Sequence, residues 1–127
     1  MVAEGITTAR KMLDRLEAAI VARDLSTLMS LCSEEVVLFG SAQANFGPNE
    51  TENYLRRVID ANSVRWILDR WAVVHHDDTT LLVAAEGHVE TSDGTTPERS
   101  AFRLTLWLIR EDDDWKLGHF HGSVPAS

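Results

Sequence analysis

The chain has 127 residues, 44% of them hydrophobic and 25% charged, which is typical of one globular domain. Its formal net charge of −8 argues against binding to nucleic acid, because phosphate binding needs clustered lysine and arginine, and no run here holds more than two adjacent basic residues. The first ten residues lack the apolar core of a secretion signal, and no stretch approaches the roughly 20 apolar residues of a membrane span, so we expect a cytoplasmic protein with no membrane partner.

The first part of the chain is expected to be helical. Apolar residues recur at helical spacing from Thr7 to about Arg23, with charged residues between them, which predicts an amphipathic helix. A short second helix is expected over residues 25–31. It is followed by Cys32, the single cysteine, which excludes an intrachain disulfide and is interpreted as a small buried hydrophobic residue.

A strand, a loop and a third helix are expected next. Residues 35–39 are rich in β-branched and aromatic side chains and predict a short strand. Residues 41–48 contain glycine, asparagine and proline and are expected to form a loop. A third helix is predicted from Pro48 to about Asn62, with acidic residues in its first turn and Tyr54 on its apolar stripe.

Four long strands are expected in the second half of the chain. They cover about residues 64–74, 80–91, 100–110 and 115–123, and acidic or glycine-bearing turns separate them. Short connections between long strands predict an antiparallel meander. Because the helices precede the strands and do not alternate with them, the fold class is α+β. No repeat or linker divides the chain, so residues 1–127 are expected to form a single domain.

Side chains alternate between the two faces of a strand. In the third long strand, this places Leu104, Leu106 and Leu108 on one face, and Arg103, Thr105, Trp107 and Ile109 on the other. In the last strand, the alternation places Trp115, Leu117, His119 and His121 on one face. Trp66 and Trp71, five residues apart, are expected on opposite faces. Because apolar residues on both faces would leave a large patch in water, we expect one face to cover the helices and the other to pack on a second copy.

The end of the chain carries a recognisable motif. Residues 111–125 read EDDDWKLGHFHGSVP: an acidic turn, a tryptophan, a β run ending in His-x-His, then serine and proline. Residues 103–106 supply an Arg-x-Thr at the corresponding distance before the tryptophan. This pattern resembles the end of SnoaL-like domains in the nuclear transport factor 2-like, or cystatin-like, superfamily. It is also similar to the association domain of calcium/calmodulin-dependent protein kinase II.

The resemblance implies an α+β cone, in which N-terminal helices pack in the concavity of a strongly curved, mainly antiparallel sheet around an apolar pocket. It also implies dimers or higher rings. Two departures bear on mechanism. The kinase association domain has an arginine after its His-x-His, where this chain has Gly122. Members that resemble ketosteroid isomerase place a carboxylate base near the end of the first strand, whereas residues 39–43 contain none, which counts against proton abstraction beside a carbonyl.

The residues expected at the pocket combine aromatic, polar and basic side chains. They are Phe39, Ser41, Tyr54, Trp66, Arg103, His119 and Phe120. His121 is the candidate for proton transfer, because an imidazole titrates near neutral pH. Arg103 lies among apolar strand residues, and a buried guanidinium needs an anionic partner, either a glutamate on the adjacent strand or a ligand carboxylate. His119 and His121 alone do not make a metal site, which needs three or four ligands, so no metal or other cofactor is predicted.

Three functions are compatible with these residues. The favoured interpretation is a homodimeric, SnoaL-like protein that binds a small apolar ligand, with catalysis left open. The second is a cofactor-independent isomerase, dehydratase or cyclase, with His121 as acid and base and Tyr54 or Arg103 stabilising an oxyanion. The third is a non-catalytic oligomerisation module. The absence of a carboxylate at the end of the first strand favours the first.

Overall fold

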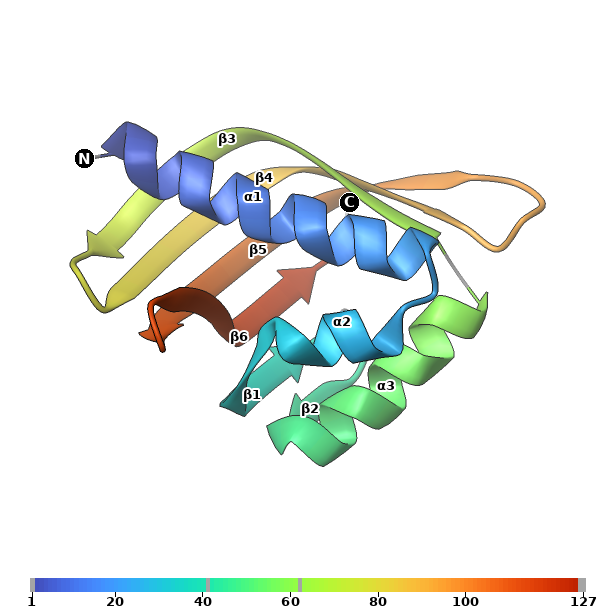
Figure 1. The fold of residues 1–127 in the computed structure, drawn as a ribbon. Helices are drawn as coiled ribbons and strands as arrows, with labels where there is room; N and C mark the ends of the chain where they lie inside the picture. The colour runs from blue at the N-terminus through green and yellow to red at the C-terminus, as the bar shows by residue number, and fades with distance from the viewer. Residues whose placement is uncertain (1, 41, 62, 126–127) are drawn as a thin grey trace.

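A computed structural model describes residues 2–40, 42–61 and 63–125, which form three helices and one six-stranded sheet (Figure 1). The helices are α1 (Val2–Val21), α2 (Leu25–Ser30) and α3 (Gly47–Ala61). The strands are β1 (Cys32–Phe39), β2 (Ala44–Phe46), β3 (Ser63–His76), β4 (Thr80–Ser92), β5 (Glu98–Glu111) and β6 (Asp114–Ser123). The predicted α+β class and the four long C-terminal strands are confirmed.

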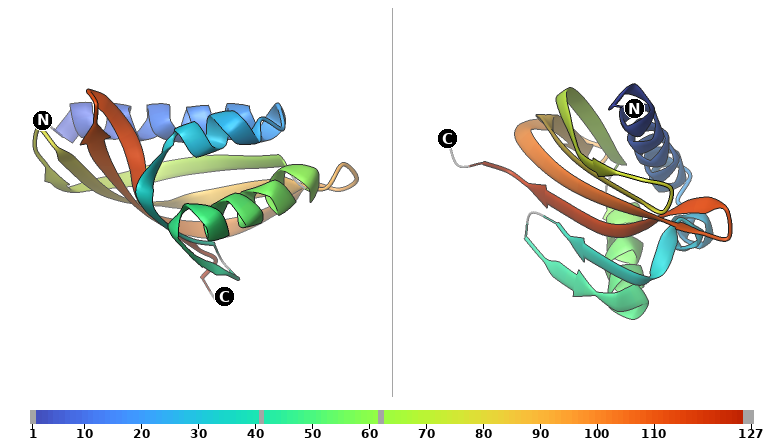
Figure 2. Two further views of the ribbon diagram at one scale, coloured as in Figure 1. Left: turned by 60° about the horizontal axis from the view of Figure 1, so that its bottom comes forward. Right: turned by 90° about the vertical axis from the view of Figure 1, so that its left-hand side faces the viewer.

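The sheet is mixed, with strand order β2-β1-β6-β5-β4-β3. Strands β3 to β6 form the expected antiparallel meander, while β1 pairs with β6 in parallel and brings the N-terminal helices onto the sheet. Two further views show the sheet strongly curved, with α1 lying across its concave face (Figure 2). The core between them includes Met12, Leu13, Leu16 and Ile20 of α1 and the three alternate leucines predicted for β5, all of which are buried.

The expectation of a loop over residues 41–48 is wrong in part, because β2 and the start of α3 lie within it. The buried side chain of Asn45 donates from Nδ2 to the Leu38 carbonyl oxygen at 3.1 Å, and the Phe46 N–H donates to Oε1 of Glu50 at 3.0 Å. The first bond ties the short edge strand β2 to β1, and the second ties β2 to the start of α3. A composition rich in loop-forming residues does not reveal them, because they depend on tertiary contact.

Helix α1 also protects the edge of the sheet at β3. Glu17 Oε1 accepts a hydrogen bond from the Trp66 N–H at 2.6 Å, and Arg10 Nη2 donates to the Leu68 carbonyl oxygen at 3.5 Å. The Arg10 guanidinium also stacks over the Trp71 ring, 5.0 Å from its centre. An edge strand otherwise presents unpaired backbone groups that recruit other chains, so these contacts satisfy the edge and fasten α1 to the sheet.

Irregular pairing decides which side chains face the helices. Along the β5–β6 pair, Trp107 lies opposite His119 and Leu108 opposite Leu117, so Gly118 is an extra residue. As a result Leu117 and Phe120 both point inward and are buried, while His119 and His121 point outward. The prediction that Trp115, Leu117, His119 and His121 share a face is therefore wrong. A bulge inverts the alternation, and the sequence pattern assumes that the alternation is unbroken.

A second irregularity corrects the prediction for the two tryptophans of β3. The register shifts between Leu68 and Arg70, which adds one residue between Trp66 and Trp71. Both rings consequently pack against the core rather than on opposite faces.

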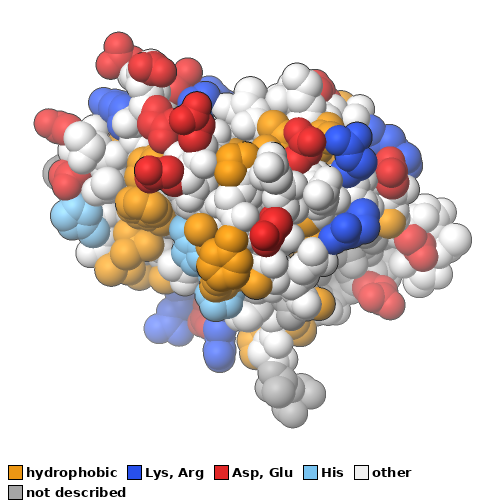
Figure 3. Space-filling view, turned by 90° about the horizontal axis from the view of Figure 1, so that it is seen from below, with side chains coloured by type: hydrophobic (Ala, Val, Ile, Leu, Met, Phe, Trp, Pro, Cys, Tyr) orange, Lys and Arg blue, Asp and Glu red, His pale blue; other side chains and the backbone are white. Residues whose placement is uncertain are grey.

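The outer face of the sheet combines apolar and histidine side chains. Two rows of paired residues cross it: Leu82, Trp107, His119, Val37 and Phe46 in one, and Ala84, Thr105, His121 and Phe39 in the other. Phe46 is 59% exposed, and a view from below shows hydrophobic side chains beside histidines on this part of the surface (Figure 3). The α-helices do not cover these rows, since they lie on the concave side (Figure 2).

The bulge at Gly118 generates a stability prediction. A Cβ atom at this position would lie 2.7 Å from Cε3 of Trp107, so Gly118→Val should lower the free energy of unfolding by about 1–3 kcal/mol. The matched change Ala101→Val, at an exposed site on β5, should alter it by less than about 0.5 kcal/mol. Urea denaturation measures both. Equal losses in the two variants would show that residue 118 has no special need for glycine.

The contact between α1 and β3 should depend on pH. Burial is the main cause that raises the pKa of Glu17 above its usual 4.5, so the folded protein holds this proton more tightly than the unfolded chain. The contribution of Glu17 to stability is then full below pH 4.5 and falls as pH rises through the higher folded pKa. A Glu17→Gln variant keeps an acceptor for the Trp66 N–H without a charge. Its stability relative to the wild type should therefore increase from pH 4.5 to pH 7 in urea denaturation, and a constant difference would contradict this assignment.

Candidate functional site

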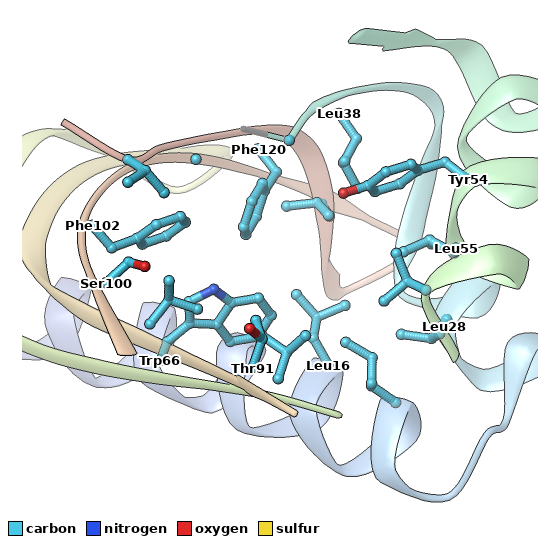
Figure 4. Close-up of a pocket in the computed structure, with 18 of the residues that line it drawn as sticks. Leu16, Leu28, Leu38, Tyr54, Leu55, Trp66, Thr91, Ser100, Phe102 and Phe120 are labelled. Carbon is cyan, nitrogen blue, oxygen red and sulfur yellow. The ribbon is translucent and has the colours of Figure 1, made fainter. Parts of the chain in front are cut away.

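A cavity of about 310 Å³ lies between the concave face of the sheet and the helices (Figure 4). The helices contribute Leu16, Ile20, Leu28, Leu55 and Val58, and the strands contribute Leu38, Val64, Val89 and Leu117. This volume is at the lower end of the range for small-molecule sites, which are mostly apolar with a few polar groups. The cavity therefore has the size and the lining of a binding site for a small organic molecule.

Aromatic rings form one end of the cavity. Trp66, Phe102 and Phe120 come from β3, β5 and β6 and surround the same space (Figure 4). The Trp66 and Phe120 rings are tilted by 54° with their centres 5.7 Å apart. Their inward direction follows from the strand register, because the Gly118 bulge turns Phe120 toward the helices. Flat apolar faces of this kind favour flat or apolar ligands.

Tyr54 supplies a polar group at the other end. It extends from α3 and directs its hydroxyl into the cavity (Figure 4). Burial raises the pKa of the Tyr54 hydroxyl, and the positive charge of Arg57 opposes this only in part, so the group is protonated at neutral pH. A protonated phenol in apolar surroundings is a hydrogen-bond donor and acceptor rather than a base.

The remaining titratable groups on the cavity wall are Cys32 and Glu98, within the residues that the structure describes. Burial raises the pKa of the Cys32 thiol to about 11, and Sγ lies 3.4 Å from the Leu28 carbonyl oxygen, to which it donates. This agrees with the interpretation of Cys32 as a hydrophobic residue. Glu98 is exposed at the start of β5, beside the hydroxyls of Thr91 and Ser100. The cavity interior is therefore uncharged at neutral pH.

The structure divides the predicted pocket residues between the two faces of the sheet. Tyr54, Trp66 and Phe120 line the cavity. Phe39, Arg103, His119 and His121 instead lie on the outer face, which corrects their placement at the pocket. The prediction for Ser41 falls outside the described residues.

The outer-face residues make contacts of their own. His119 Nδ1 lies 2.8 Å from the Val37 carbonyl oxygen, and the Phe39 ring meets both imidazoles edge to face at 5.2 and 5.4 Å. The Arg103 side chain is 66% exposed rather than buried, and its Nε lies 3.9 Å from Oε2 of Glu86 on the adjacent strand. Both Arg103 and His121 border a shallow groove on this face. The proton-transfer role of His121 stays a prediction, but the cavity is on the other side of the sheet.

Sequence reasoning missed several cavity residues. Leu16, Leu38, Leu55 and Phe102 all line the cavity but carry no signal beyond apolar spacing, which is the same for a core residue and a pocket residue. Within residues 2–40, 42–61 and 63–125, no three histidine, cysteine, aspartate or glutamate side chains are grouped as a metal site would require. No helix in this described part of the chain is both long enough and apolar enough to cross a membrane.

The sequence was compared with families and structures of known proteins. Residues 9–127 match the model of the SnoaL-like domain. The chain belongs to this family. No curated protein matches it significantly. The motif over residues 111–125 thus led to the right family, although three of the residues it highlights, His119, His121 and Ser123, lie outside the cavity wall.

Solved structures share the fold of this SnoaL-like domain at low identity. A candidate dehydratase of the NTF2-like family from Streptomyces avermitilis has a TM-score of 0.80 and 18% identity, covering 95% of this chain and 96% of the other. A candidate calcium/calmodulin-dependent protein kinase II association domain from Xanthomonas campestris has a TM-score of 0.77 and 15% identity, covering 94% and 86%. A cystatin-like protein of unknown function from Nostoc punctiforme has a TM-score of 0.73 and 11% identity, covering 95% and 91%. These likenesses establish the fold alone.

Proposed function

We propose that this SnoaL-like protein binds a small apolar molecule in the cavity beneath the sheet and acts as a homodimer. The observation that carries the first part is the cavity itself, about 310 Å³ lined mainly by leucine, valine and aromatic side chains. Transferring apolar ligand surface from water to such a lining is favourable by about 25 cal/mol per Å².

Binding fits the lining better than acid–base catalysis does. Proton transfer needs a group that changes charge near the working pH. Burial keeps Cys32 and Tyr54 protonated, and Glu98 lies in water at the cavity rim. His121, which has suitable chemistry, is on the opposite face of the sheet. The described lining of the cavity therefore supports binding rather than acid–base catalysis. The sequence of residues 39–43, which contains no carboxylate, supports the same choice.

Filling the cavity tests the proposed binding. N-phenyl-1-naphthylamine, a neutral probe that fluoresces in apolar surroundings, should bind the wild type. Val58→Phe, from α3 into the cavity, should weaken binding at least about tenfold, because the new ring occupies the site. Val21→Phe is the matched control at a site 67% exposed, and it should leave the affinity unchanged. Fluorescence titration measures all three proteins. Equal affinities would place the probe elsewhere and refute the cavity as the binding site.

The outer face supports the second part of the proposal. Its two apolar and histidine rows are flanked by Arg70 and Arg103, which both approach Glu86, at 3.3 and 3.9 Å. An apolar centre with mixed charges at its margin suits an isologous interface, in which the same patch meets itself. A second copy would also cover Phe46, which is 59% exposed, and Trp107, which is half-buried.

A charge at the centre of this face should separate the copies. Leu82 is half-buried on the outer face of β4, opposite Trp107, so Leu82→Asp should raise the dimer dissociation constant at least about tenfold by placing a carboxylate in the interface. Val21→Asp, on α1 and away from this face, is the control. Light scattering coupled to size-exclusion chromatography gives the masses. A wild type that is monomeric throughout, or a dimer unaffected by Leu82→Asp, would refute this interface.

A further inference from the structure

The polar groups inside the cavity can donate hydrogen bonds but carry no charge. The Tyr54 hydroxyl points into the cavity from α3, and Ser100 and Thr91 place hydroxyls on the wall contributed by β4 and β5 (Figure 4). Glu98 is the one carboxyl side chain on the described wall, and it is exposed at the start of β5. An anionic ligand would therefore lose its hydration without meeting a cation, and a cationic ligand would find no carboxylate in the interior.

The position of the Tyr54 hydroxyl is fixed by contact between α3 and the end of β1. A Cβ atom on Gly40 would lie 2.5 Å from this oxygen, so the glycine allows the tyrosine to approach. A chain of hydrogen bonds ties α3 and β2 to the end of β1: Arg57 to Gln43 at 3.0 Å, Gln43 to Asn45 at 3.1 Å, and Asn45 to the Leu38 carbonyl oxygen at 3.1 Å. The Gly40 N–H also donates to the Gln43 carbonyl oxygen at 2.8 Å. The backbone of Gly40, against which the Tyr54 hydroxyl lies, is thus held without a ligand, which lowers the cost of binding.

The opposite end of the cavity is shaped by rings. Trp66, Phe102 and Phe120 leave a space bounded by aromatic faces and edges, and the closest ring pair is 5.7 Å between centres. Such walls favour a flat, unsaturated ligand over a branched aliphatic one. A molecule that spans both ends meets rings at one end and a single hydroxyl at the other.

From these features, and resting on the proposed function, we propose that the ligand is a neutral aromatic molecule whose carbonyl-type oxygen accepts a hydrogen bond from Tyr54. Tyr54 is then the residue that selects an uncharged acceptor, and Gly40 is the residue that leaves room for its hydroxyl.

Three probes of one shape test this selection. 2-Acetylnaphthalene carries a carbonyl oxygen, 2-isopropenylnaphthalene replaces it with a methylene group, and 2-naphthoate replaces the acetyl group with a carboxylate. Isothermal titration calorimetry at pH 7 should show the ketone binding about three- to tenfold more tightly than the alkene, the usual contribution of one neutral hydrogen bond. The carboxylate should bind at least about tenfold more weakly than the ketone.

Two variants assign the effect to a residue. Tyr54→Phe should lower the ketone affinity to that of the alkene and leave the alkene affinity within about twofold, which also shows that the protein is folded. Ser100→Ala, which removes another hydroxyl from the cavity wall, should keep the preference for the ketone. Retention of the preference in Tyr54→Phe, its loss in Ser100→Ala, or tightest binding of the carboxylate would overturn the inference. Equal binding of all three probes would overturn the inference alone, whereas failure of all three to bind the wild type would overturn the proposed function as well.

Discussion

The extra residue at Gly118 determines which side chains of β6 face the interior of this protein. Without it, the strict alternation of β6 that puts Leu117 inward would also turn His119 and His121 toward the helices. With it, Phe120 and Gly122 line the cavity instead, and both imidazoles face outward. A single bulge thus separates an apolar, uncharged interior from an outer surface that carries titratable groups. Glycine is needed there because the Trp107 ring lies where a side chain would begin.

The two faces of the sheet consequently carry different side chains. The concave face, closed by α1 and α3, carries aromatic walls and the Tyr54 hydroxyl, on which the proposed small-molecule site depends. The outer face carries Trp107, Phe39 and Phe46, bordered by an Arg–Glu–Arg cluster, on which the proposed dimer interface depends. The fold alone leaves both uses open. Side chains on each face, rather than the cone itself, decide the function.

Much of the fold could be predicted from the sequence because its strongest signals are local. Helical spacing placed α1 and α3, β-branched runs placed the long strands, and the alternate leucines of β5 proved to be buried as expected. The terminal motif led to the family. The bulges in β3 and β6 could not be predicted, because an added residue becomes visible only in the pairing with the neighbouring strand, whereas the sequence pattern assumes an unbroken alternation. The shift between Leu68 and Arg70 explains the wrong face assigned to Trp71, and the bulge at Gly118 explains those assigned to His119 and His121. Arg103 was expected to be buried because it stands among apolar residues in the sequence, but its neighbours Phe102 and Leu104 belong to the opposite face.

Contacts between a bound ligand and methyl groups test most directly whether the concave face is the binding site. A filtered nuclear Overhauser experiment on the methyl-labelled protein with N-phenyl-1-naphthylamine reports which face the ligand touches. The predicted contacts are with Leu16, Leu55 and Val89, which line the cavity. Contacts with Val37, Leu82 and Ile109 instead would place the ligand on the outer face and contradict the division of roles between the two sides of the sheet.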